Sequence, residues 1–202
     1  MTPSAFSRLL IRWNGLDVAG FAAWEYLPGM RFAERGAWWR GGADRGGPHE
    51  GLDLCWYRTA DGRRLGLGAG ARVPAICAGE VVSVVDDFLG VSLFVAHGHR
   101  DSRGWLLHTI YGHLAPAPGL APGSRLVDGA AVGAVADTSG RSVPVPPHVH
   151  ISVALVAGGR PGAARLDWAA LRDPDRALLL DPLPLIGGAA GERCDPEAPP
   201  RG

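Results

Sequence analysis

Near the N-terminus, apolar side chains recur at intervals of three and four residues, at Phe6, Leu9, Leu10 and Trp13. This spacing predicts a short amphipathic helix over residues 4–14, which the Asn14-Gly15 pair ends. Arg8 and Arg12 are the only basic residues of this segment, too few for an anchor on a membrane surface. We therefore expect the helix to pack against the rest of the protein.

From residue 41 to about residue 156 the apolar pattern changes to short runs of β-branched and aromatic residues between Gly, Pro and Asp turns. Such runs predict the strands of an antiparallel sheet domain. The predicted strands are 51–57, 72–76, 80–85, 91–97, 106–111, 131–136 and 149–157. A helical turn is expected at 167–172.

These patterns divide the chain into three parts. Residues 1–40 form an aromatic N-terminal extension, and residues 41–183 form the β-rich domain. The tail, residues 184–202, has little apolar surface to offset its ordering entropy and is expected to be disordered. The large aromatic residues of the extension are expected either to cap the core or to line a groove; they are Trp24, Tyr26, Phe32, Trp38 and Trp39.

The charge balance argues against partners that recognise a global field. Lys plus Arg number 20 and Asp plus Glu number 20, so we expect no nucleic-acid partner. No stretch approaches the ~18 uncharged apolar residues of a membrane helix, so no integral membrane segment is expected. No secretory signal is visible either, which leaves the cellular location open, and nothing in the sequence defines an oligomeric state.

The three cysteines, Cys55, Cys77 and Cys194, are an odd number without paired short spacing. They predict neither a disulfide framework nor a cysteine-type zinc cluster, and at least one thiol must stay free. Cys55 shares the strand parity of Asp53 and could reach a metal there. We interpret it instead as a small buried hydrophobe.

His148 and His150 lie at the start of a predicted strand, where residues two apart project to the same face. Their imidazoles should therefore stand side by side, one able to bind a metal and the other left to move a proton. Three prolines just before them, Pro144, Pro146 and Pro147, exclude a helix.

A second candidate cluster lies far upstream, where His49 and Asp53 are separated by four positions across a glycine. Two imidazole nitrogens and one carboxylate oxygen leave a fourth tetrahedral position open, as in a catalytic zinc site. His113 lies at a predicted strand-to-loop junction, where catalytic groups are common. Three other histidines surround the polar loop 98–104 and are interpreted as surface or groove-rim residues: His97, His99 and His108.

Together these elements resemble the lysostaphin-like zinc endopeptidases, which cut peptide cross-links of bacterial cell walls. The resemblance covers roughly residues 41–183. The matching segments are His-Glu-Gly-Leu-Asp (49–53), Ala-Gly-Glu-Val-Val (78–82), Tyr-Gly-His-Leu (111–114), Asp-Thr-Ser-Gly-Arg-Ser (137–142) and Pro-His-Val-His-Ile (147–151).

The resemblance implies that His49, Asp53 and His150 bind Zn²⁺ and that His113 and His148 are the catalytic histidines. It also implies a small antiparallel β-sandwich with a groove over one sheet. The expected activity is zinc-dependent hydrolysis of peptide bonds, in peptidoglycan cross-links or in Gly-containing peptides. Such a substrate would place the protein at the cell envelope.

The chain departs from the family pattern at three points. No tyrosine precedes the first histidine within residues 41–48, so the role of stabilising the oxyanion is unassigned. The segment before His148 reads Val-Pro-Val-Pro-Pro where the family is Gly-rich. Ser152 stands where a Glu commonly follows.

Two other functions compete with the peptidase. A non-catalytic peptidoglycan-binding or partner-binding regulatory domain could use the same scaffold, although degenerate relatives usually lack ligands that are present here. Two histidines and one aspartate could also form the facial triad of a non-haem iron oxygenase. That scheme leaves His113 and His148 without a task. Arg45 and Arg141 flank the site and could contact a substrate carboxylate, although exposed arginines are usually only solvated.

Overall fold

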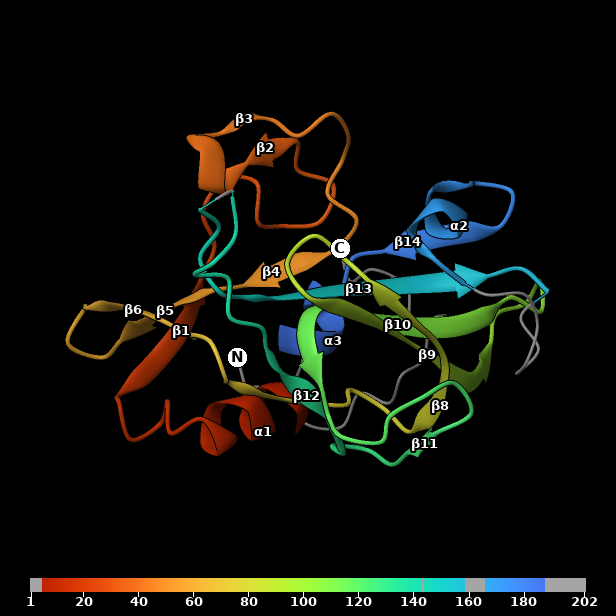
Figure 1. Ribbon diagram of the computed structural model, residues 1–202, viewed down its shortest axis with the longest axis horizontal. Coiled ribbons are helices and arrows are strands. Elements are labelled where there is room, and N and C mark those ends of the chain that lie inside the picture. Colours follow the sequence, from red (N-terminus) through yellow and green to blue (C-terminus); the bar gives the residue numbers. More distant parts are fainter. Residues whose placement is uncertain (1–4, 143, 159–165, 188–202) are drawn as a thin grey trace.

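The computed structural model describes residues 5–142, 144–158 and 166–187 (Figure 1). The protein is mainly β, with antiparallel sheets and one short N-terminal helix, as the apolar pattern predicted. In the described ranges, no helix is long and apolar enough to cross a membrane. Of the predicted tail 184–202, residues 184–187 lie in a short helix that buries Ile186, and residues 188–202 lie outside the described residues.

Among the described residues the helical elements are short, and only the first of them exceeds two turns. They are α1 (Ala5–Trp13), the 3₁₀ helix η1 (Trp38–Arg40), α2 (Trp168–Arg172) and α3 (Leu183–Gly187). The strands are β1 (Phe21–Glu25), β2 (Gly36–Ala37), β3 (Ala43–Asp44), β4 (Leu52–Leu54), β5 (Trp56–Thr59), β6 (Arg64–Gly66), β7 (Arg72–Pro74), β8 (Gly79–Asp86), β9 (Val91–Arg100), β10 (Leu106–Pro116), β11 (Arg125–Leu126), β12 (Ala131–Val135), β13 (Val149–Val156) and β14 (Ala177–Leu180).

The main sheet is built around β10. The strand order is β11-β8-β9-β10-β12-β7, and β13 pairs with β10 on the side away from β9. Residues 106–112 of β10 pair with β13, whereas residues 114–116 pair with β12. The change of partner falls at His113, which has a φ of +63°. β10 therefore continues through the predicted strand-to-loop junction and bends there.

The predicted strand 51–57 is two strands in different sheets. β4 pairs with β13 in the main sheet, while β5 pairs with β1 and β6 in a separate three-stranded sheet. The chain passes from one sheet to the other at Cys55. The sequence does not reveal this division, because the apolar pattern is the same in both strands and only the strands they pair with differ.

The two faces of β10 are covered by different core clusters. Tyr111 packs in a large cluster that includes Phe6 and Leu10 of α1, so the N-terminal helix packs on the domain as expected. Ile110 packs on the opposite face with Ala170 and Leu171 of α2. Burying side chains of this size contributes roughly 1.5–3 kcal/mol each to stability, measured against exposing them.

The aromatic residues of the extension take both expected positions. Trp24 and Tyr26 pack against the main core. Phe32 and Trp39 line a cavity described below. Trp38 is buried beside both Met30 and Cys55 in a cluster of its own.

Cys55 behaves as a buried hydrophobe rather than as a ligand. Its Sγ lies 3.6 Å from the carbonyl oxygen of Pro147, and burial raises the pKa of the thiol to about 12. A neutral thiol of this kind is a poor metal ligand. Cys77 is disulfide-bonded, which the cysteine spacing did not predict.

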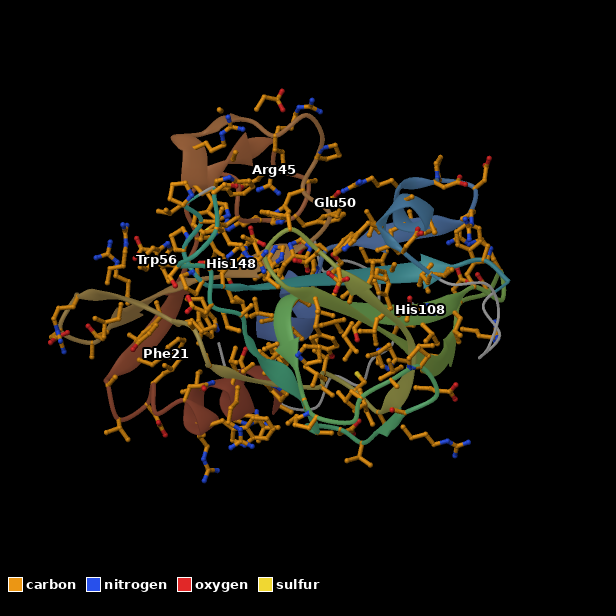
Figure 2. All side chains as sticks on the ribbon, in the orientation of Figure 1. Phe21, Arg45, Glu50, Trp56, His108 and His148 are labelled. Atoms are coloured by element: carbon orange, nitrogen blue, oxygen red, sulfur yellow. The ribbon has the colours of Figure 1, made fainter. Side chains whose placement is uncertain are left out.

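The interpretation of His97 and His108 as surface or groove-rim residues was wrong, because both are buried and neither lines the cavity of the candidate site. His97 is 5% exposed and His108 is 3% exposed, because both lie on strands whose faces are covered by the core. The imidazole of His97 bridges the carbonyl oxygen of Ala78 at 2.7 Å and Thr109 Oγ1 at 2.9 Å. Figure 2 shows His108 well apart from His148, so it does not belong to the candidate site. His99 is exposed, as predicted.

His108 should make the protein less stable in acid. Burial lowers the pKa of His108 to about 4, from an ordinary value of 6.5. The folded state therefore favours the neutral form of His108. The contribution of this residue to the stability of the fold is complete above about pH 6.5 and is lost as the pH falls towards 4.

The variant His108→Asn keeps a hydrogen-bond donor for the carbonyl oxygen of Leu106 but does not titrate. Between pH 7 and pH 4, the free energy of unfolding should fall in both proteins. The fall should be about 3 kcal/mol smaller in the variant than in the wild type. Urea unfolding of zinc-free protein at both pH values measures the difference. Equal losses in the two proteins would show that His108 does not titrate in this range.

Candidate metal centre

The candidate ligands come from two paired strands and the loop before them. Asp53 of β4 is the register partner of His150 of β13, so both side chains project to the same face of the sheet. His49 lies in the loop before β4, and three residues, including Gly51, separate it from Asp53. A Cβ on Gly51 would lie 2.2 Å from the carbonyl oxygen of Ile151 and 2.8 Å from His150 Nε2. Only glycine therefore lets the loop approach the strand closely enough.

Three donor atoms converge at this point. His49 Nε2 lies 3.0 Å from His150 Nδ1, and Asp53 Oδ1 lies 3.2 Å from the first and 2.8 Å from the second. All three residues are at most 5% exposed. The sequence-predicted ligand set is therefore assembled in one buried place.

The donor set fits a zinc ion. Zn²⁺ bonds of about 2.0–2.1 Å in a tetrahedral site place neighbouring ligand atoms about 3.3 Å apart, slightly further than the separations here. Two imidazole nitrogens and one carboxylate oxygen are ligands that zinc accepts, and they leave one position for substrate or water. A cation could be bound here with ligand shifts of a few tenths of an ångström.

Each candidate ligand is oriented through its other polar atom. His49 Nδ1 donates to the carbonyl oxygen of Arg31 at 3.1 Å, which leaves Nε2 with its lone pair facing the other ligands. Trp38 Nε1 donates to Asp53 Oδ2 at 2.7 Å. His150 Nε2 contacts Ser152 Oγ at 2.8 Å, so Ser152 occupies the position where the family pattern has a Glu. Outer contacts of this kind hold ligand rings and carboxylates in a metal-binding orientation.

The charges of the site favour an ionised Asp53. Burial by itself raises the pKa of this carboxyl, but the imidazoles of His49, His148 and His150 and their hydrogen bonds hold it well below its usual range. Burial lowers the pKa of His150, which keeps its ring neutral. An anionic Asp53 carboxylate and a neutral His150 ring are the protonation states that a divalent cation needs.

The two remaining predicted histidines, His113 and His148, lie beside this cluster. His148 Nδ1 donates to the carbonyl oxygen of Pro146 at 2.8 Å, so its Nε2, 3.7 Å from Asp53 Oδ1, carries the lone pair. The rings of His113 and His148 have centroids 4.8 Å apart. All five sequence-predicted residues are therefore brought together.

His113 is held by Asp87, which the sequence analysis did not identify. Asp87 Oδ1 accepts a hydrogen bond from His113 Nδ1 at 3.0 Å, and Oδ2 accepts one from the His113 backbone N–H at 2.9 Å. The pKa of Asp87 is lowered because the contacts with His113 outweigh the effect of burial. This double contact stabilises the left-handed backbone conformation that His113 adopts at the bend of β10.

The site opens into a cavity of about 1100 Å³. The lobe of β2 and β3 and the segment of α2 and β14 rise on the same side of β13 and form its two walls (Figure 1). Phe88, which is 58% exposed, lies on the β8–β9 turn with its ring edge-on to His113. The wall is largely apolar, and it contains Phe32, Trp39, Phe88, Trp168, Leu171 and Leu178.

Trp38 and Asp87 were not predicted as site residues. Trp38 was grouped with aromatic residues that cap a core or line a groove, and its indole instead contacts Asp53 directly. Asp87 carried one weak signal, its position just after the predicted strand 80–85. Residues 41–48 contain no tyrosine. Arg45 is the side chain in this stretch that lines the cavity and has several hydrogen-bond donors.

No protein-family model and no curated protein matches the sequence. Among solved structures, the catalytic domain of lysostaphin from Staphylococcus simulans is 17% identical with a TM-score of 0.41, over 82% of this chain and 86% of that one. A variant of the catalytic domain of the prophage-encoded M23 protein EnpA from Enterococcus faecalis is 23% identical with a TM-score of 0.40, over 73% and 94%.

A solution structure of lysostaphin is 18% identical with a TM-score of 0.40. That match covers 74% of this chain and 48% of lysostaphin, so the chain spans about half the length of that protein. These matches describe what the chain is similar to. The chemistry that it can perform is inferred from its own residues.

Trp38→Phe should weaken metal binding without changing the ligands. The substitution removes the indole N–H that orients Asp53 but keeps an aromatic ring in the cluster. We expect the zinc affinity to fall about 10- to 100-fold, as for other losses of an outer hydrogen bond. Competition with a chromophoric chelator measures the affinity.

Trp39→Phe is the matched control, because Trp39 packs edge-on against Trp38 and lines the cavity but has no hydrogen bond to Asp53. Its zinc affinity should match that of the wild type. A Trp38→Phe protein that binds zinc as tightly as this control would contradict the orienting role.

Proposed function

We propose that this chain is a zinc-dependent endopeptidase that hydrolyses peptide bonds, in peptidoglycan cross-links or in Gly-containing peptides. The observation that carries the proposal is the convergence of His49, Asp53 and His150 within 3.2 Å, with the rings of His113 and His148 beside them. His49, Asp53 and His150 would hold the ion. Zinc supplies a Lewis acid for a carbonyl oxygen and lowers the pKa of water from about 15.7 to about 7.

His148 is suited to move a proton at its Nε2. Because Nδ1 donates to the carbonyl oxygen of Pro146, the neutral ring has its free lone pair on Nε2, on the side of Asp53. Burial lowers the pKa of His148 to about 4, so the ring is neutral and able to accept a proton. General base help of this kind contributes roughly 10² to 10⁴ in rate.

His113 is suited to the same chemistry, and its ring lies next to that of His148. The Asp87 carboxylate accepts from Nδ1 and stabilises the ring when Nε2 gains a proton. One of the two histidines would accept the proton of the attacking water at Nε2. A proton would then pass from an imidazolium Nε2 to the nitrogen of the departing amine. Both histidines would transfer protons, in either order.

A peptide is the substrate class that best matches this arrangement. The cavity of about 1100 Å³ lies between two walls, and the candidate metal ligands line it on the sheet face that carries His150. The sequence resemblance to lysostaphin-like endopeptidases supports peptide bonds of cell-wall cross-links, and the cell envelope would then be the place of action. A partly apolar groove also removes water from the reacting groups, which strengthens their electrostatic interactions.

Single substitutions should separate metal binding from turnover. His113→Ala should bind one zinc per chain and hydrolyse neither cross-linked peptidoglycan nor a Gly-rich peptide, because a proton carrier is lost while the ligands remain. Replacing His49, Asp53 or His150 with Ala should remove both zinc and activity. Metal analysis by mass spectrometry and release of new amino termini measure the two properties.

His99→Gln is the control, since His99 is an exposed histidine outside the cavity. It should keep both properties. Loss of zinc in His113→Ala would make this residue a ligand, and full zinc with full activity in Asp53→Ala would contradict the proposed site. Zinc binding without hydrolysis by the wild type would favour the non-catalytic binding domain, and iron in place of zinc would favour the oxygenase.

A further inference from the structure

Arg45 is a charged residue that lines the cavity and that the proposed hydrolysis does not use. It follows β3, on the lobe above β13 that also carries Glu50 (Figure 2). Its Cζ lies 5.0 Å from the centroid of the Trp39 ring, and its Nη2 donates to the carbonyl oxygen of Gly29 at 2.9 Å. These two contacts hold the planar guanidinium at one place in the cavity wall.

The other charged residues of the cavity wall are already paired. Glu50 and Arg172 form an ion pair at 2.8 Å. Asp87 is paired with His113, and Asp53 with the imidazoles of the candidate metal centre. Arg45 forms no ion pair with any residue that the structure describes, and its buried Nε has no hydrogen-bond partner.

The environment of Arg45 favours an added anion. Burial lowers the pKa of the guanidinium, although Asp53, Glu50 and Glu34 oppose this effect from a distance. A guanidinium stays charged in proteins, and a partly desolvated one gains more from an anion than an exposed one does. A zinc ion held by Asp53 would add two positive charges to the same cavity.

We infer that Arg45 is a carboxylate-binding subsite, which binds an acidic side chain or a terminal carboxylate of the peptide at a fixed number of residues from the bond that is cut. The inference rests on the proposed function and specifies its substrate class: acidic peptides should bind better than uncharged Gly-rich ones. The guanidinium matches a carboxylate because its donors form a planar fork. The apolar residues around it, Phe32 and Trp39 among them, contact the remainder of the peptide.

The test uses a library of N-acetylated, C-terminally amidated peptides, so that all carboxylates are on side chains. Each position is varied between Glu and Gln and between Asp and Asn around a central Gly-Gly. Zinc-loaded wild type is expected to cut peptides with an acidic residue at one position about tenfold or more faster than their amide counterparts. Mass spectrometry of the products gives the ratio at every position.

Arg45→Met keeps the length of the side chain without its charge, and it should abolish this preference. Arg45→Lys keeps the charge without the fork and should retain part of it, which excludes a general loss of folding. Arg141→Met is the matched control, because Arg141 is exposed and does not line the cavity. Its acidic preference should equal that of the wild type.

A second measurement does not depend on hydrolysis. The same library is equilibrated with zinc-loaded His113→Ala, with and without Arg45→Met, and the retained peptides are identified. Enrichment of acidic over amide peptides that requires Arg45 supports the subsite even if no bond is cut, in which case the proposed hydrolysis fails alone. Cleavage without any acidic preference overturns the subsite alone. A fall in kcat for Glu and Gln peptides alike, with KM unchanged, also overturns it, because Arg45 would then act on the reacting carbonyl.

Discussion

The buried carboxylate of Asp53 is the group around which this site is organised. An ionised carboxylate that is 2% exposed costs several kcal/mol in the folded state unless it is paired. Its Oδ1 contacts the imidazoles of His49 and His150, and its Oδ2 accepts a hydrogen bond from Trp38. These partners come from the loop before β4, from β13 and from η1. One carboxylate therefore fixes three separate segments relative to one another, and the cavity wall depends on their placement.

The bend of β10 is a second constraint that joins fold and site. β10 leaves β13 and pairs with β12 after residue 112, and His113 lies at the point of exchange with a positive φ. This conformation costs about 1–3 kcal/mol for a residue other than glycine, and the two hydrogen bonds from His113 to Asp87 offset it. The ring of His113 consequently stands beside His148 rather than in the sheet. In a straight strand the ring would project to the same face as Tyr111, which the main core cluster covers.

The sequence could predict those features of the fold and the site that depend on residues close together in the chain. The spacing of His148 and His150 on a strand and the composition of the β-rich segment required no knowledge of distant contacts. The metal ligands were assigned through resemblance of whole motifs, because nothing local brings residue 49 to residue 150. Trp38 and Asp87 could not be assigned, since their roles depend on how two loops fold against the sheet. His97 and His108 were misplaced because a neighbouring polar loop suggested exposure, whereas both strands are covered on each face.

The central claim is that His49, Asp53 and His150 hold one zinc ion. Diffraction from crystals of the zinc-loaded protein, collected on either side of the zinc absorption edge, tests it directly. The account predicts one anomalous peak per chain, about 2 Å from His49 Nε2, Asp53 Oδ1 and His150 Nδ1. A peak at another place in the molecule, or none in this cluster at full zinc loading, would contradict it.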